Sequence, residues 1–286
     1  MFASPWSTVR FVDGANGNDN NSGLKPTEPL DTIQAAVTAS GRGDVIYVRP
    51  QAYVVGTGFT RYTEEVTTVL TQSDLSIIGC VNTPNPEYGV RWKHATNTTG
   101  YCLVNIAPAL HIENIGFFAE SAAGAMSILN NGTTDTQRGT DGTTIYNCVV
   151  KGKGIIVRSG GDGFTIQNTR FHCGYDGAVA NLDYSCSANP GRRLLVRNCE
   201  WQDGNGTVSS GPCITILPPL TEILIRDCYF PQIPTGSAWI VMTGASNEGL
   251  VANCHFAVAD MTLSTGILKG GVFVTGIYDE TGLITA

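Results

Sequence analysis

Charge is scarce in this chain of 286 residues, and the little that is present is not basic. Asp, Glu, Lys and Arg make up 14% of the residues, and the formal net charge is −7. An ordinary globular domain has about 25% charged residues. A protein that binds nucleic acid through its phosphates needs a basic surface, so the composition argues against a nucleic-acid partner.

Long apolar runs are also missing. No stretch reaches ~18 uninterrupted apolar residues, so we expect no transmembrane helix and no membrane partner. The first residues lack a basic segment followed by an apolar run, and we therefore expect no signal peptide. Helix formers are few while Gly reaches 34 residues, which excludes a helical bundle or a coiled coil.

Metal-binding patterns are absent as well. The nine cysteines include no Cys-x-x-Cys pair, and the four histidines are scattered along the chain. We expect neither a metal site nor a cofactor. An odd number of cysteines leaves at least one free thiol, which fits synthesis in a reducing cytosol. A disulfide between Cys173 and Cys186, which flank a polar loop, stays open at this stage.

What the sequence does contain is a short block that recurs six times. Each copy has an Asn or Asp preceded by alternating apolar residues and followed by a small or apolar residue, and it ends in an aromatic or apolar residue three positions after the centre. The central residues are Asn114, Asn147, Asn168, Asn198, Asp227 and Asn253, separated by 33, 21, 30, 29 and 26 residues. Repeats of this length are typical of stacked structural units.

Within each block the apolar residues alternate, as they do in a strand with one buried face. They stand two before, one after and three after the centre, for example Val196, Cys199 and Trp201 around Asn198. The alternation therefore slips by one residue at the centre, which would turn the next strand inside out unless the chain bends there. Asn tolerates the left-handed backbone conformation that such a corner needs.

These features predict an all-β parallel solenoid in which equivalent residues stack at ~4.8 Å. The central residues would then form an inner ladder of amides, with internal columns of cysteines and aromatics beside it. An antiparallel β-sandwich is the alternative.

The two ends differ from the repeats. We expect residues 1–70 to form a strand–helix–strand cap, residues 71–258 the coils, and residues 259–286 capping or oligomerisation strands. Leu30, Ile33 and Val37 fall on one face of a short helix, and Gly41 is a suitable stop. A helix at an open end of a solenoid would cover its core.

The N-terminal segments carry a family resemblance. They read Phe11-Val12-Asp13-Gly14, Gly17-Asn18-Asp19, Ser22-Gly23-Leu24, Pro29-Leu30-Asp31-Thr32-Ile33-Gln34-Ala35-Ala36 and Gly43-Asp44-Val45-Ile46-Tyr47-Val48. This opening, with the Asn-centred blocks after it, resembles the right-handed parallel β-helix proteins of the pectate-lyase-like superfamily over most of the chain. The resemblance implies a right-handed, single-stranded parallel β-helix of about seven coils with a short N-terminal capping helix.

That superfamily includes pectate lyases, polygalacturonases, phage tailspike depolymerases and non-enzymatic virion proteins, so the fold does not fix the function. A hydrolase needs two carboxylates about 5–9 Å apart, and a lyase needs an acidic calcium site and a base. The outward positions two after each centre hold Arg170, Glu200, Tyr229 and His255, without two adjacent carboxylates. Glu200 with Asp203, assisted by Arg170, is the best catalytic alternative, but a solvated or inter-subunit face is favoured and no catalytic residue is assigned.

Three leucines share the outward position three before the centre: Leu195, Leu224 and Leu250. An exposed apolar stripe of this kind marks a partner surface. Burial beneath the segment with Pro218 and Pro219 is an equal alternative. If a partner is present, the fold family implies a parallel homotrimer with these leucines as its subunit interface.

Our first hypothesis is a trimeric phage virion protein, either a capsid decoration (cement) protein or a head knob, made in the host cytoplasm. It would bind the major capsid protein or other virion proteins through residues before Arg10, with Phe2 and Trp6, or through residues 261–286. The alternative is a tailspike-like depolymerase, polysaccharide lyase or glycoside hydrolase acting on a host surface glycan. A third hypothesis is a sugar-binding module, with candidate aromatic residues Tyr146, Tyr175, Tyr184 and Tyr229.

Overall fold

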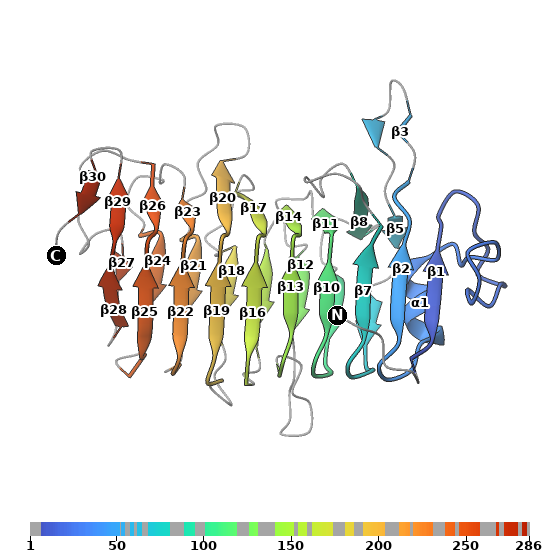
Figure 1. The fold of residues 1–286 in the computed structure, drawn as a ribbon, viewed down its shortest axis with the longest axis horizontal. Helices are drawn as coiled ribbons and strands as arrows, with labels where there is room; N and C mark the ends of the chain where they lie inside the picture. Colours follow the sequence, from blue (N-terminus) through green and yellow to red (C-terminus); the bar gives the residue numbers. More distant parts are fainter. Residues whose placement is uncertain are drawn as a thin grey trace.

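The chain folds into three long β-sheets that run side by side (Figure 1). The computed structural model describes residues 7–51, 53–54, 58–59, 62–64, 68–80, 89–94, 101–118, 126–130, 141–151, 154–158, 162–173, 181–185, 191–203, 212–217, 220–230, 238–243, 246–257, 267–268, 272–279 and 282–284. The protein is all-β, its long sheets are parallel, and the arrangement is consistent with a β-solenoid.

The strands of each sheet follow one another in a fixed spatial order. The first sheet contains β1 (Val9–Val12), β2 (Val45–Val48), β7 (Ser76–Gly79), β10 (His111–Glu113), β13 (Thr144–Tyr146), β16 (Phe164–Gln167), β19 (Leu194–Arg197), β22 (Ile223–Arg226), β25 (Gly249–Ala252) and β28 (Val272–Thr275). The second contains β5 (Tyr62–Glu64), β8 (Val90–His94), β11 (Ile115–Phe118), β14 (Val149–Lys151), β17 (Arg170–Cys173), β20 (Glu200–Asp203), β23 (Tyr229–Phe230), β26 (His255–Phe256), β29 (Ile277–Asp279) and β30 (Gly282–Ile284). The third contains β6 (Thr68–Leu70), β9 (Tyr101–Asn105), β12 (Met126–Asn130), β15 (Ile155–Val157), β18 (Leu182–Tyr184), β21 (Ile214–Ile216), β24 (Ile240–Met242) and β27 (Ile267–Leu268). A separate antiparallel pair is formed by β3 (Tyr53–Val54) and β4 (Gly58–Phe59).

From β5 to β29 the chain visits the three sheets in rotation, so strands that follow one another in sequence lie in different sheets. Apart from the final pair of β29 and β30, strands that neighbour each other within these sheets pair in parallel, as in Ile166 beside Val196 and Val196 beside Ile225. The antiparallel sandwich is therefore wrong. Its hairpins would place consecutive strands side by side.

The interior consists of columns of equivalent side chains. The residues two before each corner are fully buried: Ile112, Ile145, Ile166, Val196, Ile225 and Val251. An aromatic column lies three after the corner, where the rings of Phe171 and Trp201 stack at 4.8 Å, Trp201 and Phe230 at 4.6 Å, and Phe230 and Phe256 at 4.7 Å between centroids. The alternation predicted from the sequence thus places these apolar side chains in one core.

The helix α1 (Ile33–Ala39) lies close to β1, β2, β5 and β6. Thr32 caps its start, since its hydroxyl accepts a hydrogen bond from the Ala35 N–H at 3.0 Å. The helix ends at Ala39 with Ser40 as its cap, so Gly41 stands at the first position after the cap, where a stop glycine is expected. The Ser40 hydroxyl donates to the Ala36 carbonyl at 2.7 Å and satisfies the last turn.

Two sheet edges are covered. At the N-terminal end, Phe11 donates its N–H to the Gly23 carbonyl and accepts from the Leu30 N–H, so the segment from Gly14 to Leu30 occupies the free edge of β1. At the other end, β30 pairs antiparallel with β29 and closes the second sheet. Among the described residues, no helix has the length and apolar character to cross a membrane.

Candidate functional site: the corner ridge and its flanking faces

The corner ridge is the line of residues that join the first-sheet strands to the second-sheet strands. It comprises Asn114, Asn147, Asn168, Asn198, Asp227, Asn253 and Gly276. Each has a positive φ, between 49° and 59°, as the slip in the alternation predicts. A left-handed conformation costs an ordinary residue about 1–2 kcal/mol, and Asn and Gly adopt it more readily.

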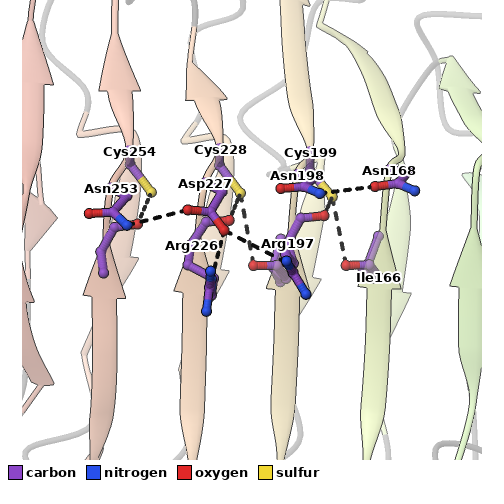
Figure 2. Close-up of polar contacts among 12 residues, drawn as sticks. Ile166, Asn168, Arg197, Asn198, Cys199, Arg226, Asp227, Cys228, Asn253 and Cys254 are labelled. Atoms are coloured by element: carbon purple, nitrogen blue, oxygen red, sulfur yellow. Dashed lines mark hydrogen bonds and ion pairs between the residues drawn. The ribbon is translucent and has the colours of Figure 1, made fainter.

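The ridge side chains bond from one coil to the next (Figure 2). Asn147 Nδ2 donates to Asn114 Oδ1 at 2.6 Å, Asn198 Nδ2 to Asn168 Oδ1 at 3.3 Å, and Asn253 Nδ2 to Asp227 Oδ1 at 3.4 Å. The backbone adds a second series, in which the N–H of each Asn and Asp of the ridge donates to the carbonyl of the residue that precedes the next corner. The ridge therefore ties neighbouring coils together through both side chains and main chain.

The expectation of an inner ladder is wrong in one respect. Asn168, Asn198 and Asn253 are exposed, and the other Asn and Asp members are half-buried. The residue after each corner, such as Cys199 after Asn198, occupies the interior instead. A left-handed corner lets that next side chain turn inward while the amide remains on the outer surface.

Asp227 changes the ladder because a carboxylate only accepts hydrogen bonds. It accepts from Arg226 Nε at 2.7 Å and lies 3.7 Å from Arg197 Nε (Figure 2). The hydrogen bond from Arg226 is the main reason that the pKa of Asp227 lies below its ordinary value of 3.8, with further lowering from Asn253 and the Arg197 charge. One ionised carboxylate therefore holds two arginines at the carboxyl ends of first-sheet strands.

Beneath the ridge lies a column of thiols: Cys148, Cys199, Cys228 and Cys254. Each donates to the backbone carbonyl two residues earlier, at 3.2 to 3.4 Å. Burial raises the pKa of Cys148 to about 12, and the hydrogen bond with Cys199 is the main cause of the raised pKa of Cys228. Thiols held in the neutral form are weak nucleophiles, so Cys148 and Cys228 contribute to packing.

The structure brings together only part of the predicted catalytic alternative, which comprises Glu200, Asp203 and Arg170. On the outer face of the second sheet, Arg170 Nε lies 3.1 Å from Glu200 Oε2, and Gln202 Nε2 donates to Glu200 Oε1 at 2.6 Å. Asp203 ends the same strand, but its side chain lies outside the described residues. The strand neighbours of Glu200 are Arg170 and Tyr229, so neither adjacent position supplies a second carboxylate.

The aromatic residues proposed for sugar stacking separate into different environments. Tyr184 is fully buried in the third sheet, which removes it as a sugar platform, and Tyr175 lies outside the described residues. Tyr146 is half-buried. Tyr229 is 40% exposed, but its ring stacks on His255 at 5.3 Å between centroids, so one ring face is already covered.

The three predicted interface leucines lie in one line on the outer face of the first sheet. Leu195 pairs with Leu224, and Leu224 with Leu250. All three are half-buried, whereas the inward residues between them are covered. Pro218 and Pro219, proposed as an alternative cover, lie outside the described residues.

The structure adds a fourth member that the sequence blocks did not include. Phe273 on β28 pairs with Leu250 and is 67% exposed. The block escaped detection because Gly276 takes the place of the central Asn. A corner formed by Gly has no side chain that a sequence pattern can detect, although the sequence from Val272 to Tyr278 does contain apolar alternation. We call Leu195, Leu224, Leu250 and Phe273 the leucine face.

Other site predictions fall partly outside the described residues. Cys186 and the side chain of Cys173 are among these, so the proposed disulfide is not tested. Within the part of the chain that the structure describes, no three His, Cys, Asp or Glu residues are grouped to hold a metal ion.

No protein-family model matches this chain, and no curated protein matches it as a relative. The surfaces described above therefore carry the functional argument.

Proposed function

We propose that this chain is a virion structural protein, a trimeric phage capsid decoration or head-knob protein that bridges neighbouring shell subunits. The leucine face is the observation that carries this proposal. It places one large apolar side chain per strand on an outer surface, in four consecutive strands of the first sheet. Phe273 is 67% exposed and the three leucines are half-buried, so the line presents partly exposed apolar surface of the kind that a partner contact covers.

The finer architecture belongs to the same proposal. The rotation among three sheets and the N-terminal sequence support a right-handed, single-stranded parallel β-helix with α1 as its cap, like those of the pectate-lyase-like superfamily. Among the described residues the third sheet has eight strands, one for each passage, which supports about eight coils rather than the seven expected from the sequence. Such a stack pairs its inner backbone groups along its length and resists local opening. This mechanical property suits a protein that reinforces a shell.

The major capsid protein is the proposed shell partner, and the virion is the proposed location, reached after synthesis in the host cytoplasm. Contact with the shell would use the residues before Arg10, of which residues 1–6 lie outside the described residues, or the C-terminal end, residues 261–286. Tyr278 and Leu283 there are 42% and 58% exposed on the last two strands of the second sheet, which supports the C-terminal end.

The test is reconstitution on shells. Purified protein is mixed with capsids from a phage that lacks it, and bound copies are measured by co-sedimentation and cryo-electron microscopy. We expect saturable binding at symmetry-related positions and a higher temperature of shell disruption. Shells that neither bind the protein nor gain stability would contradict the proposal.

A glycan-processing enzyme is the second candidate, favoured by the ion pair of Arg170 and Glu200 beside the exposed ring of Tyr229. It predicts release of reducing ends or unsaturated uronates from one member of a polysaccharide panel. Glu200→Gln and Asp203→Asn should then abolish that release while leaving the circular dichroism spectrum unchanged. Activity that survives both changes would remove this site from consideration.

A further inference from the structure

The leucine face is linear and regular. Its residues occupy register-matched positions on β19, β22, β25 and β28, so one large apolar side chain projects from each strand. Exposure is greatest at the C-terminal end, where Phe273 is 67% exposed. The line therefore runs along the direction in which the strands stack, with a spacing of ~4.8 Å.

Two charged rims border this line. Charged residues stand at both ends of β22, on either side of Leu224: Glu222, which is exposed, comes just before the strand, and Arg226 ends it. The entry rim contains Arg193, Glu222 and Glu248 and has one net negative charge. The exit rim contains Arg197, Arg226 and Asp227 and has one net positive charge.

Both rims are accessible. Glu222 and Glu248 are exposed, and the side chains of Arg197 and Arg226 are 47% and 39% exposed. On the entry rim, Glu222 also meets Arg193 at 3.1 Å within the chain. Glu248 forms no ion pair among those that the described residues show, so the entry rim keeps an unbalanced carboxylate.

The spacing of the line points to the kind of partner. A partner surface that presents one apolar side chain at every strand interval is another stack of strands with the same spacing. A second copy of the leucine face has that spacing because it consists of the same strands. Leucine and phenylalanine side chains of two such lines can interdigitate over four strands.

The rims decide the orientation. In a cyclic assembly whose axis runs along the strand stack, the exit rim of one copy faces the entry rim of its neighbour, so opposite charges meet. If one copy were reversed, arginines would face arginines and glutamates would face glutamates, which is unfavourable at an interface.

We propose that the leucine face is the contact between copies of this chain, which lie parallel around a common axis, with Arg226 of one copy paired to Glu222 of the next. The inference rests on the proposed function only for the number of copies, three. The face, the orientation and the ion pair follow from the described residues.

The first test changes the apolar line. Sedimentation equilibrium gives the mass of the wild type, of Leu224→Asp and of Phe273→Glu, with Leu217→Asp as the matched control. Leu217 is 47% exposed and follows directly after β21 of the third sheet, away from the leucine face. We expect the wild type and Leu217→Asp to be oligomeric and the two face variants to be monomeric with unchanged circular dichroism spectra.

A monomeric wild type would overturn the inference, and so would folded face variants that remain assembled. Two variants are used because Phe273 is so exposed that its replacement leaves the core intact even if Leu224→Asp fails to fold. Dissociation by Leu217→Asp alone would place the contact on the third sheet and would also overturn the inference.

The second test addresses orientation. Arg226→Glu and Glu222→Arg should each weaken association by about tenfold or more, because like charges then meet across the contact. The double variant exchanges the charges and should restore assembly. Failure of the double variant to recover, with its fold intact, would overturn the parallel arrangement.

The capsid experiment separates this inference from the proposed function. A parallel oligomer that dissociates with Leu224→Asp but ignores capsids leaves the inference standing and removes the virion function. Capsid binding by a protein whose face variants remain oligomeric supports the virion function and overturns the inference about the contact between copies.

Discussion

At the scale of single residues, the corner ridge is defined by backbone conformation more than by side-chain chemistry. Six Asn or Asp residues and Gly276 share a positive φ, and the side chains of the Asn and Asp members lie on the outside of the corner. Hydrogen bonds between partly exposed side chains each contribute modestly, about 0.5–1.5 kcal/mol. The backbone preference of Asn for the corner should therefore stabilise the fold at least as much as its bond in the ladder.

Asn198 allows these two contributions to be separated. Asn198→Ala places an ordinary residue at φ 50° and should lower the free energy of unfolding by about 1–2 kcal/mol, because Ala resists the left-handed region. Asn198→Gly keeps that conformation and loses only the bond to Asn168, so a smaller loss is expected. Urea denaturation of both variants gives the comparison. Equal losses for Ala and Gly would show that backbone conformation is not the larger of the two contributions.

Asp227 should make stability depend on pH in the acidic range. Its pKa is lower in the folded chain than the ordinary 3.8, so its stabilising effect is present above that value and is lost as the pH falls through the folded-state pKa. Relative to Asp227→Asn, the wild type should be more stable near neutrality by about 0.5 kcal/mol, as for partly exposed ion pairs. The difference should close on acidification.

Urea titrations at several pH values measure this difference. High salt provides a control, because it screens the contacts of Asp227 with Arg197 and Arg226 and should narrow the gap at neutral pH. A difference that stays constant down to the lowest pH at which both proteins fold would contradict the role assigned to Asp227.

At the scale of elements, the second sheet has a buried aromatic column on its inner face and a polar row on its outer face. Trp201 and Tyr229 illustrate the two environments, since Trp201 stacks between Phe171 and Phe230 whereas Tyr229 is 40% exposed. Alternation along each strand produces this division. Substitutions on the two faces should therefore have very different effects.

Trp201→Ala should lower the free energy of unfolding by about 3–5 kcal/mol, because it removes a large buried side chain and leaves a cavity in the column. Trp201→Phe should recover much of that loss, since Phe occupies the same position in adjacent strands. Tyr229→Ala, the outward control, should cost less than about 1 kcal/mol. Thermal and urea unfolding would measure all three, and similar losses for Trp201→Ala and Tyr229→Ala would argue against the column as a source of stability.

Element by element, the sequence was most informative where side chains repeat. Alternation around Asn147, Asn168 and Asn198 predicted strands, corners and inward residues that the structure contains. The sequence was less informative where backbone conformation or a single hydrogen bond determines a corner or the end of a helix. Gly276 forms a corner without a recognisable side chain, and Ser40 ends α1 through one hydroxyl bond that periodicity does not encode.

The candidate site was less predictable than the fold. Leu195, Leu224 and Leu250 were found because they share one position in the repeat, but Phe273 required the register of β25 with β28. The outward direction of the ridge amides also followed only from the geometry of the corner. The exit rim lies within the repeat blocks, but the entry rim could not be inferred, because Arg193, Glu222 and Glu248 lie outside the blocks.

At the scale of the whole molecule, each strand contacts mainly its neighbours in the stack, so stability should be close to a sum of local contributions. The separation of Asn168 from Asn198 is 30 residues. Deleting Thr169–Asn198 would join Asn168 to Cys199 and remove one complete passage through the three sheets. The strand β16 would then lie beside β22, with the inward residues Ile166 and Ile225 in contact.

We expect this shortened chain to fold, with a β-rich circular dichroism spectrum and a moderately lower melting temperature. Deleting only Thr169–Tyr184 should prevent folding, because the chain would return to the first sheet without its second- and third-sheet strands. Circular dichroism and thermal melts distinguish these outcomes. If both deletions behaved alike, the molecule would not be built from interchangeable coils.

The covered edges have a consequence for how copies can meet. A parallel sheet with both edges bare would recruit further strands and grow into fibres. Here the segment from Gly14 to Leu30 blocks such recruitment at β1, and the reversed strand β30 blocks it at the far end of the second sheet. Growth by strand addition is thereby blocked at β1 in the first sheet and at β29 in the second.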